Sequence, residues 1–386
     1  MLLDNYNEIV HRCFRCGYCK FTGGKTPDDK YILNCPAFKK WRFETFSPGG
    51  KMWLIFAVMN NELEWSESMA KIIYSCTTCG NCMEHCVFKF NEDIVDIFEA
   101  AREQLFFQEF APEKFRQFGE HIAKEHNPYM ESHKDRLNWL PKDAKISETA
   151  EVGYFVGCTA AYRQTKIAQN TVKILNKMGT EFQVFGEEWC CGSPLIRTGQ
   201  TKLALEQAKH NIEKFEEAGI KQLITSCAGC YRTLKEDYPK KFELNYNFEV
   251  LHLTEYLEKN LDKLEFKQPL NKSVTYHDPC HLGRHANLYE PPRSILKKFP
   301  GINFIEMKKN RRDATCCGAG GGVKSEFSEW SLEMARDRIL EAKEIGAEIL
   351  VSTCPFCNRN FLDAKKEFNL NIEIYDLTEL IIEYFI

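Results

Sequence analysis

Beyond about residue 148, short apolar runs alternate with longer segments of helical periodicity. The runs are too short for helices of usual length and fit buried strands instead. The intervening helices are expected to end at Gly179 and Gly219, because glycine readily closes a helix. Strands are expected at 152–157, 182–185 and 222–226, and a strand with an attached helix at 248–257. This alternation predicts a parallel α/β unit.

The same order of elements returns in the last third of the chain. A helix is expected at 328–345, and the closing stretch IEIYDLTELI is similar to the earlier VLHLTEYL. Strands are expected at 274–277, 302–307, 348–352 and 372–377. The chain therefore carries two duplicated α/β units, expected at 148–270 and 271–386. Loops at the carboxyl ends of parallel strands converge on one crevice, which is where ligands bind in such folds.

The first part of the chain, expected to form a separate domain at 1–147, has helical periodicity without strand-like runs. An apolar helix is expected at 51–60, and an amphipathic helix at 92–126 is expected to break near Pro112. Its aromatic side chains are either a docking face for a partner or packing between helices, and helical spacing favours packing. These aromatic residues are Phe106, Phe107, Phe110, Phe115 and Phe118.

Composition narrows the class of protein. The chain has 386 residues, 44% of them apolar and 27% charged, which is ordinary for a globular protein of two or three domains. A net charge of -4 gives no reason to expect nucleic acid. The best apolar run, 52–59, is far shorter than the roughly 20 residues that span a bilayer. We expect a soluble, cytoplasmic protein whose membrane contact, if any, goes through a partner.

Ten of the 18 cysteines repeat one pattern twice. Each set has a single cysteine, then an adjacent pair, then a CxxC. The first set is Cys158, Cys190, Cys191, Cys227 and Cys230, and the second is Cys280, Cys316, Cys317, Cys354 and Cys357. The gaps are 31, 35 and 2 residues in the first set and 35, 36 and 2 in the second. Matched spacing in both α/β units indicates a duplicated metal-binding unit.

The other eight cysteines fall in the first 86 residues, in ferredoxin-like groups. In two-cluster ferredoxins, the fourth cysteine of each run ligates the other cluster. The expected ligand sets are therefore Cys13, Cys16, Cys19 and Cys86 for one [4Fe–4S] cubane, and Cys76, Cys79, Cys82 and Cys35 for the other. Two features depart from the ferredoxin pattern: an insertion at 20–34, and Val87 rather than proline after Cys86.

Three other uses of these cysteines account for fewer of them. Buried structural cysteine does not explain adjacent pairs at matched positions. A four-sulfur zinc site could use both CxxC pairs, but it would leave the two single cysteines and the adjacent pairs idle. A thioredoxin-type dithiol leaves the same residues unused. Iron–sulfur ligation uses all 18, and five ligands for each α/β unit point to clusters other than cubanes.

The two five-cysteine sets resemble the CCG cysteine-rich domain, and the whole chain resembles the D-type subunit family of heterodisulfide reductase. The stretches HDPCHLGR, YEPPRSIL and CCGAGGG carry the local likeness. The resemblance implies an α+β multidomain fold, with an N-terminal α-helical two-cluster ferredoxin domain followed by two duplicated α/β CCG domains related by pseudo-symmetry. It also implies a noncubane [4Fe–4S] cluster on each five-cysteine set, beside the two cubanes.

Several other residues are candidates for the site. Gly192, Gly318 and Gly320 would let the backbone approach a bulky cluster with its N–H groups toward sulfur. His277 and His281 flank Cys280 and could donate a hydrogen bond or a proton, although a structural histidine is as good an interpretation. Five cations near the cysteine loops could receive an anionic substrate, and a solvated side chain is the default for each. They are Arg163, Arg197, Arg232, Arg284 and Lys324.

Two functions follow from the resemblance. The first is an enzyme that passes electrons from the cubanes to the noncubane sites and reduces a small-molecule disulfide, with the coenzyme M–coenzyme B heterodisulfide as the leading substrate. The second is an electron-accepting subunit of a flavin-dependent lactate or glycolate dehydrogenase. The sequence has no flavin or nicotinamide fingerprint, so both need a redox partner. A flavoprotein, a cytochrome b-type membrane subunit or a hydrogenase-linked protein would serve.

Overall fold

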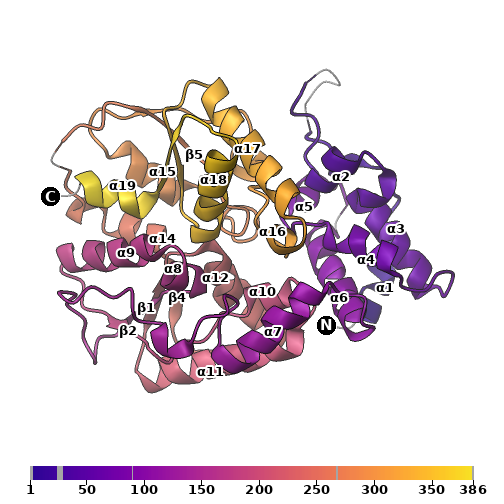
Figure 1. The fold of residues 1–386 in the computed structure, drawn as a ribbon, viewed down its shortest axis with the longest axis horizontal. Coiled ribbons are helices and arrows are strands. Elements are labelled where there is room, and N and C mark those ends of the chain that lie inside the picture. Colours follow the sequence, from indigo (N-terminus) through magenta and orange to yellow (C-terminus); the bar gives the residue numbers. More distant parts are fainter. Residues whose placement is uncertain (1–2, 24–28, 89, 267, 385–386) are drawn as a thin grey trace.

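The computed structural model describes residues 3–23, 29–88, 90–266 and 268–384 (Figure 1). Residues 24–28 of the 20–34 insertion lie outside this part. The N-terminal domain is helical, as expected, and stands to one side of two α/β units. Its helices are α1 (Asn7–Arg12), α2 (Pro36–Trp41), α3 (Pro48–Met59), α4 (Glu67–Tyr74), α5 (Asn81–His85), α6 (Ile94–Phe107) and α7 (Glu113–Glu125).

Local sequence explains where these helices begin and break. Helix α3 begins three residues before the predicted start, because the Ser47 side chain accepts a hydrogen bond from the Gly50 amide at 3.0 Å. The break expected near Pro112 separates α6 from α7. Phe115 is fully buried in the core of this domain, so aromatic packing is confirmed there, whereas Phe107 is exposed to solvent.

The two α/β units have the same parallel sheet topology. The first sheet has the order β2-β1-β3-β4 and the second β6-β5-β7-β8. The strands are β1 (Val152–Phe155), β2 (Gln183–Val184), β3 (Gln222–Thr225), β4 (Glu249–His252), β5 (Ser273–Tyr276), β6 (Asn303–Phe304), β7 (Ile349–Ser352) and β8 (Glu373–Asp376). The predicted duplication is confirmed. The predicted strand at 302–307 is too long, since β6 pairs with one neighbour only, for two residues.

Helices cover both sheets. Those of the first unit are α8 (Cys158–Tyr162), α9 (Thr165–Lys177), α10 (Ser193–Ile196), α11 (Thr201–Glu217), α12 (Ala228–Arg232), α13 (Tyr238–Phe242) and α14 (Leu253–Lys259). Those of the second are α15 (Glu290–Lys297), α16 (Val323–Glu326), α17 (Ser328–Glu344), α18 (Pro355–Glu367) and α19 (Leu377–Tyr384). Helix α9 packs against α19, and α14 against α15, so one hydrophobic core runs through both units (Figure 1).

One buried arginine joins the three parts of the chain. Arg102 of α6 is fully buried and donates to the carbonyl oxygens of Arg197 at 2.6 Å and of Gly321 at 3.0 Å. The first acceptor belongs to the first α/β unit and the second to the second unit. The guanidinium also donates to the Ile73 carbonyl of its own domain at 3.0 Å. Its fixed fork of donors therefore holds the N-terminal domain against both units.

No helix in the ranges that the structure describes has both the length and the apolar character needed to cross a membrane.

A buried carboxyl at the end of β8 gives a pH-dependent stability. Asp376 caps α19 by accepting hydrogen bonds from the Thr378 amide at 2.9 Å and hydroxyl at 2.6 Å, while its second oxygen has no partner among the residues that the structure describes. Burial raises the pKa of Asp376 to about 8. The folded chain therefore keeps a proton that the unfolded chain releases near its ordinary pKa of about 3.9.

We expect this carboxyl to lower stability as pH rises from about 4 to about 8. The slope is at most about 1.4 kcal/mol per pH unit, because only one proton is involved. D376N keeps an oxygen that can cap α19 and should flatten this part of the stability curve. Denaturant titrations between pH 5 and 8 measure the effect. Parallel curves for the variant and the natural chain would contradict the assignment.

Candidate metal centres

None of the 18 cysteines is in a disulfide, and all but Cys316 line one of three cavities. The first small cavity is lined by Cys13, Cys16, Cys19 and Cys86. The second small cavity is lined by Cys35, Cys76, Cys79 and Cys82. Four thiols around a small apolar space fit an iron–sulfur cluster. The grouping is the one that the crossed ferredoxin arrangement requires.

The large cavity lies between the two α/β units and holds about 1630 Å³ of empty space, including open solvent. Nine of the ten cysteines of the two five-cysteine sets line it, and Cys316 alone does not. The cavity lies where the loops after the parallel strands meet, as expected for the crevice of such folds.

Direct thiol contacts connect the cavities. A hydrogen bond with Cys316 holds the pKa of Cys79 well below its usual range, which joins the second small cavity to the second five-cysteine set. Hydrogen bonds with Cys230 and then Cys354 hold the pKa of Cys227 well below its usual range. The contact between Cys227 and Cys354 joins the two sets. Sulfur contacts therefore run from the second small cavity into the large cavity and across it.

Backbone contacts hold the second small cavity against the second α/β unit. Arg284 donates to the Cys79 carbonyl and to the Ala314 carbonyl, each at 2.6 Å. A side chain on Gly321 would lie 2.6 Å from the Cys76 carbonyl, so only glycine allows this close approach. Arg284 is consequently a structural cation, and the expectation of a solvated side chain is wrong for it.

The predicted glycines place backbone N–H groups near cysteine sulfurs. The Gly192 amide lies 3.5 Å from Cys190 Sγ, and the Gly318 amide lies 3.4 Å from Cys316 Sγ. Both glycines have positive φ angles, which an L side chain rarely adopts. The space of a missing Gly318 side chain is taken by α17 rather than by the cavity. Gly320 lines the large cavity itself.

The candidate cations differ sharply in their partners. Arg197 and Arg232 are buried in an ion-pair cluster with Glu99 and Asp237, so the expectation of a solvated side chain is wrong for both arginines. Lys324, on the cavity wall, pairs with Asp363 at 2.7 Å. Their charges are already compensated within the protein, which leaves them little attraction for an added anion.

The remaining wall cations surround one tyrosine of the 126–131 segment. The guanidinium carbons of Arg163 and Arg359 lie 4.8 and 5.6 Å from the centre of the Tyr129 ring. Arg163 also pairs with Glu131 at 2.6 Å. Within the described chain, Arg359 is the cation on this wall without a carboxylate partner. Arg359 and Tyr129 were missed from the sequence, although an arginine two residues after the last CxxC was a usable signal.

The 126–131 segment is tied to the first five-cysteine set. The carbonyl of His126 accepts a hydrogen bond from the Cys190 amide at 2.9 Å. The buried Asn127 side chain accepts from the Tyr129 amide at 3.0 Å and donates to the Glu131 carbonyl at 2.8 Å. The segment that follows α7 therefore forms a fixed wall of the large cavity.

A buried ion pair missed from the sequence supports the first set. Glu188 accepts hydrogen bonds from the amides of Val156 at 2.8 Å and Gly157 at 2.9 Å, and from the guanidinium of Arg136. Arg136 also points a donor at Cys158 Sγ, 3.8 Å away. The sequence signal for this ion pair was the charge of Glu188, which directly precedes Trp189 and Cys190.

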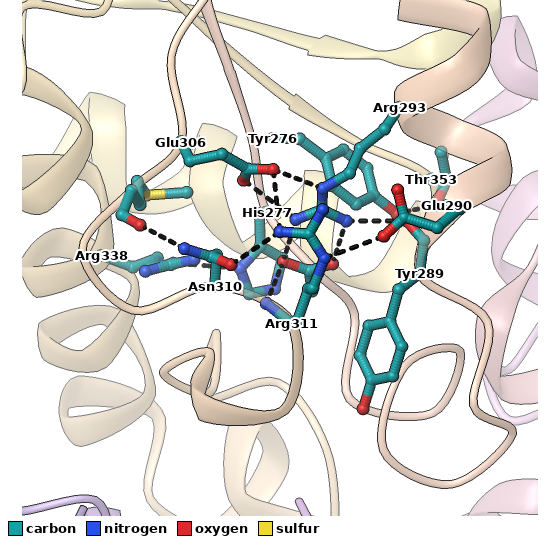
Figure 2. Close-up of polar contacts among 12 residues, drawn as sticks. Tyr276, His277, Tyr289, Glu290, Arg293, Glu306, Asn310, Arg311, Arg338 and Thr353 are labelled. Atoms are coloured by element: carbon teal, nitrogen blue, oxygen red, sulfur yellow. Dashed lines mark hydrogen bonds and ion pairs between the residues drawn. The ribbon is translucent and has the colours of Figure 1, made fainter. Parts of the chain in front are cut away.

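A polar network fixes the segment before Cys280 (Figure 2). Arg293 donates to both carboxylate oxygens of Asp278, at 2.7 and 2.9 Å, and to Glu306 at 2.6 Å. The Arg311 amide donates to Asp278 at 2.8 Å. Because bidentate pairs fix orientation as well as charge, this network sets the direction of the chain that leads to Cys280.

The two candidate histidines occupy different places. His281 lines the large cavity, and burial lowers its pKa well below the ordinary value, so its imidazole is neutral at pH 7. His277 is buried behind the wall. One of its ring nitrogens lies within 4.8 Å of the sulfurs of Cys317 and Cys357.

Comparisons with known proteins agree with this arrangement. The family described as 4Fe-4S dicluster domain matches residues 9–90, and the family described as cysteine-rich domain matches residues 152–235 and 274–361. The chain is 39% identical over 388 residues to the subunit designated D of the dihydromethanophenazine:CoB–CoM heterodisulfide reductase of Methanosarcina barkeri, covering 96% of this chain and 93% of that protein.

Two further comparisons place the chain more broadly. The subunit designated B of the fumarate reductase (CoM/CoB) of Methanothermobacter marburgensis is 32% identical, over 80% of this chain and 61% of that protein. The crystal structure of a hypothetical protein from Helicobacter pylori matches with a TM-score of 0.59 at 13% identity, over 88% of this chain and 67% of that one, and so shares the fold. The chain belongs to the D-type subunit family of heterodisulfide reductase, a family of iron–sulfur oxidoreductase subunits.

Proposed function

We propose that the chain holds four tetranuclear clusters. One cubane would bind in each small cavity, and one noncubane cluster on each five-cysteine set in the large cavity. The grouping of thiols around each cavity supports these ligand sets. The corresponding domains are 1–147, 148–270 and 271–386. Both boundaries fall in irregular segments, before β1 and before β5.

We infer that the chain reduces a disulfide, with the coenzyme M–coenzyme B heterodisulfide as the leading substrate. Both five-cysteine sets line one cavity that opens to solvent, and this observation carries the proposal. Bound clusters supply electrons one at a time, whereas cleaving a disulfide to two thiols takes two electrons and two protons. Placing both sets around one space lets the same substrate face both.

The protein residues hold the substrate and control its surroundings. The 126–131 segment closes one wall of the large cavity and limits the water that reaches the sulfur atoms. Neutral His281 also lines the cavity, and its buried Nε2 atom has no hydrogen-bond partner in the described chain. The unpaired guanidinium of Arg359 would bind an anionic group of the substrate.

The proposal also orders the electron path. The electron donor, a flavoprotein, a cytochrome b-type protein or a hydrogenase-linked protein, would dock at the first small cavity, where Cys16 is exposed. The second small cavity follows. Its Cys79 contacts Cys316 and so connects it to the second five-cysteine set.

Metal content and spectroscopy test this function. Anaerobically purified protein should contain about sixteen iron atoms per chain, for four tetranuclear clusters. Adding excess heterodisulfide to the partly reduced protein should give a new paramagnetic signal, because one electron from the protein half-cleaves the disulfide. A colourless, zinc-rich preparation would refute the cluster assignment. A fully loaded protein without the new signal, purified with a flavoprotein, would instead support a role as electron acceptor of a 2-hydroxy acid dehydrogenase.

Removing the unpaired charge should weaken substrate binding more than turnover. R359Q is expected to raise KM for an anionic disulfide by about tenfold or more, because a charged hydrogen bond contributes about 1.5–3 kcal/mol. The value of kcat should change little. Steady-state kinetics at constant ionic strength measure both. K366Q, on the exposed side of α18, is the matched control. An unchanged KM for R359Q would remove Arg359 from the substrate site.

A further inference from the structure

The duplicated units differ at one position beside their cysteines. Tyr154 of β1 and Tyr276 of β5 occupy equivalent places, since each hydroxyl bonds to the residue before the first cysteine of the CxxC, Ser226 at 2.9 Å and Thr353 at 2.8 Å. The next residue is Phe155 in the first unit, and its ring has no polar atom.

In the second unit, the equivalent of that phenylalanine is His277. Its amide donates to the Val351 carbonyl at 2.8 Å, which fixes the backbone at the end of β5. A ring nitrogen lies within 4.8 Å of the sulfurs of Cys317 and Cys357. The second five-cysteine set therefore has an imidazole beside two of its sulfurs, and the equivalent position of the first unit has a hydrocarbon ring.

A buried arginine fixes the proton on this imidazole. Arg338 Nε donates to His277 Nδ1 at 3.2 Å (Figure 2), and Arg338 is held in turn by Glu341 at 2.6 Å. A nitrogen that accepts a hydrogen bond carries no proton, so in the neutral ring the proton is on Nε2. Nε2 is buried and has no hydrogen-bond partner among the described residues.

This protonation excludes one role and leaves another. A protonated Nε2 has no free lone pair, so His277 is not a metal ligand, although it lies near two thiols. With Nδ1 occupied by Arg338, Nε2 is the ring nitrogen left to donate, and the sulfurs of Cys317 and Cys357 lie near the ring. Resting on the proposed function, which places a cluster on this set, we propose that His277 is a positioning residue whose Nε2–H donates to the cluster thiolates of the second unit and makes that site easier to reduce than it would be with the phenylalanine of the first unit in its place.

The physical reason is charge. Each added electron makes the thiolates more negative, so a fixed N–H donor stabilises the reduced state more than the oxidised state. The first set receives no such side-chain donor from Phe155.

The test is a redox titration of the loaded full-length chain, followed by electron paramagnetic resonance. H277F, which places the residue of the first unit in the second, should make one noncubane site about tenfold harder to reduce, or about 59 mV lower in potential. The other site serves as an internal standard. Electron–nuclear double resonance should show one exchangeable proton coupling in the natural chain and its loss in H277F.

Two more variants decide ambiguous outcomes. H277Q, which keeps an N–H donor, should recover part of the shift. R338Q leaves His277 in place and should lower the same potential by a smaller amount. If H277F loses iron, R338Q becomes the deciding variant. An unshifted potential of the noncubane site in R338Q then overturns the proposal. F155L should leave both potentials unchanged.

The remaining outcomes separate this inference from the proposed function. A strong nitrogen coupling in the natural chain would show direct ligation and overturn the donor role. Shifted potentials in a protein that does not react with disulfide would uphold His277 and reject the disulfide reaction.

Discussion

Replacing Cys79 by serine is expected to stop electrons from reaching the large cavity. This thiol lines the second small cavity and also contacts Cys316 of the second five-cysteine set, so it connects these two sites on the proposed electron path. Losing the cluster proposed there should lower iron from about sixteen to about twelve atoms per chain. Disulfide reduction driven by a protein donor should fall to background.

The measurement compares two electron sources in the same variant. A protein donor must use the small cavities, whereas a small chemical reductant such as reduced viologen reaches the open large cavity directly. Viologen-driven reduction should therefore survive in C79S. Equal loss with both reductants would mean that the variant damages the large cavity itself. Full activity with the protein donor would show that electrons bypass the second small cavity.

The second large effect concerns stability. Replacing Glu188 by alanine is expected to destabilise the first α/β unit by about 3–5 kcal/mol, because Arg136 would become an unpaired charge in a dry interior. Both side chains are at most 1% exposed, and two backbone amides would also lose their acceptor. The thermal midpoint should fall by several degrees.

The charge and the shape of Glu188 can be separated. E188Q keeps the size and one acceptor oxygen, so it should cost less than E188A. The double variant R136M/E188M removes both charges and should recover part of the loss, as replaced buried ion pairs often do. Anaerobic calorimetry of the loaded protein measures all three. A single variant E188A as stable as the natural chain would show that the pair contributes nothing.

Spacing in the sequence predicted the parts of the fold that repeat. The alternation of apolar runs and helices indicated two parallel sheets, and matched cysteine gaps indicated their equivalence. The lengths of the edge strands were predicted less well. Strands β2 and β6 pair with one neighbour each, so little of their apolar sequence is held in extended form.

The cavity wall could not be predicted in the same way, because its residues are distant in sequence. The ring of Tyr129, in the 126–131 segment, lies beside Arg163 of the first unit and Arg359 of the second unit. A single sequence has no signal for such a meeting. Arg197 and Arg232 show the reverse problem, since their carboxylate partner Glu99 lies in another domain.

The uneven exposure of the cysteines has a consequence for handling in air. Cys16 is exposed, beside Phe14 and Tyr18 with 74% and 63% of their surface open to solvent, whereas three of the four cysteines of the second small cavity are buried and the fourth is half-buried. Dioxygen will attack where it has access. Brief aeration should therefore destroy the cluster proposed at the first small cavity before the others. The chain would then no longer accept electrons from its protein donor, but it would keep the clusters of the other two cavities.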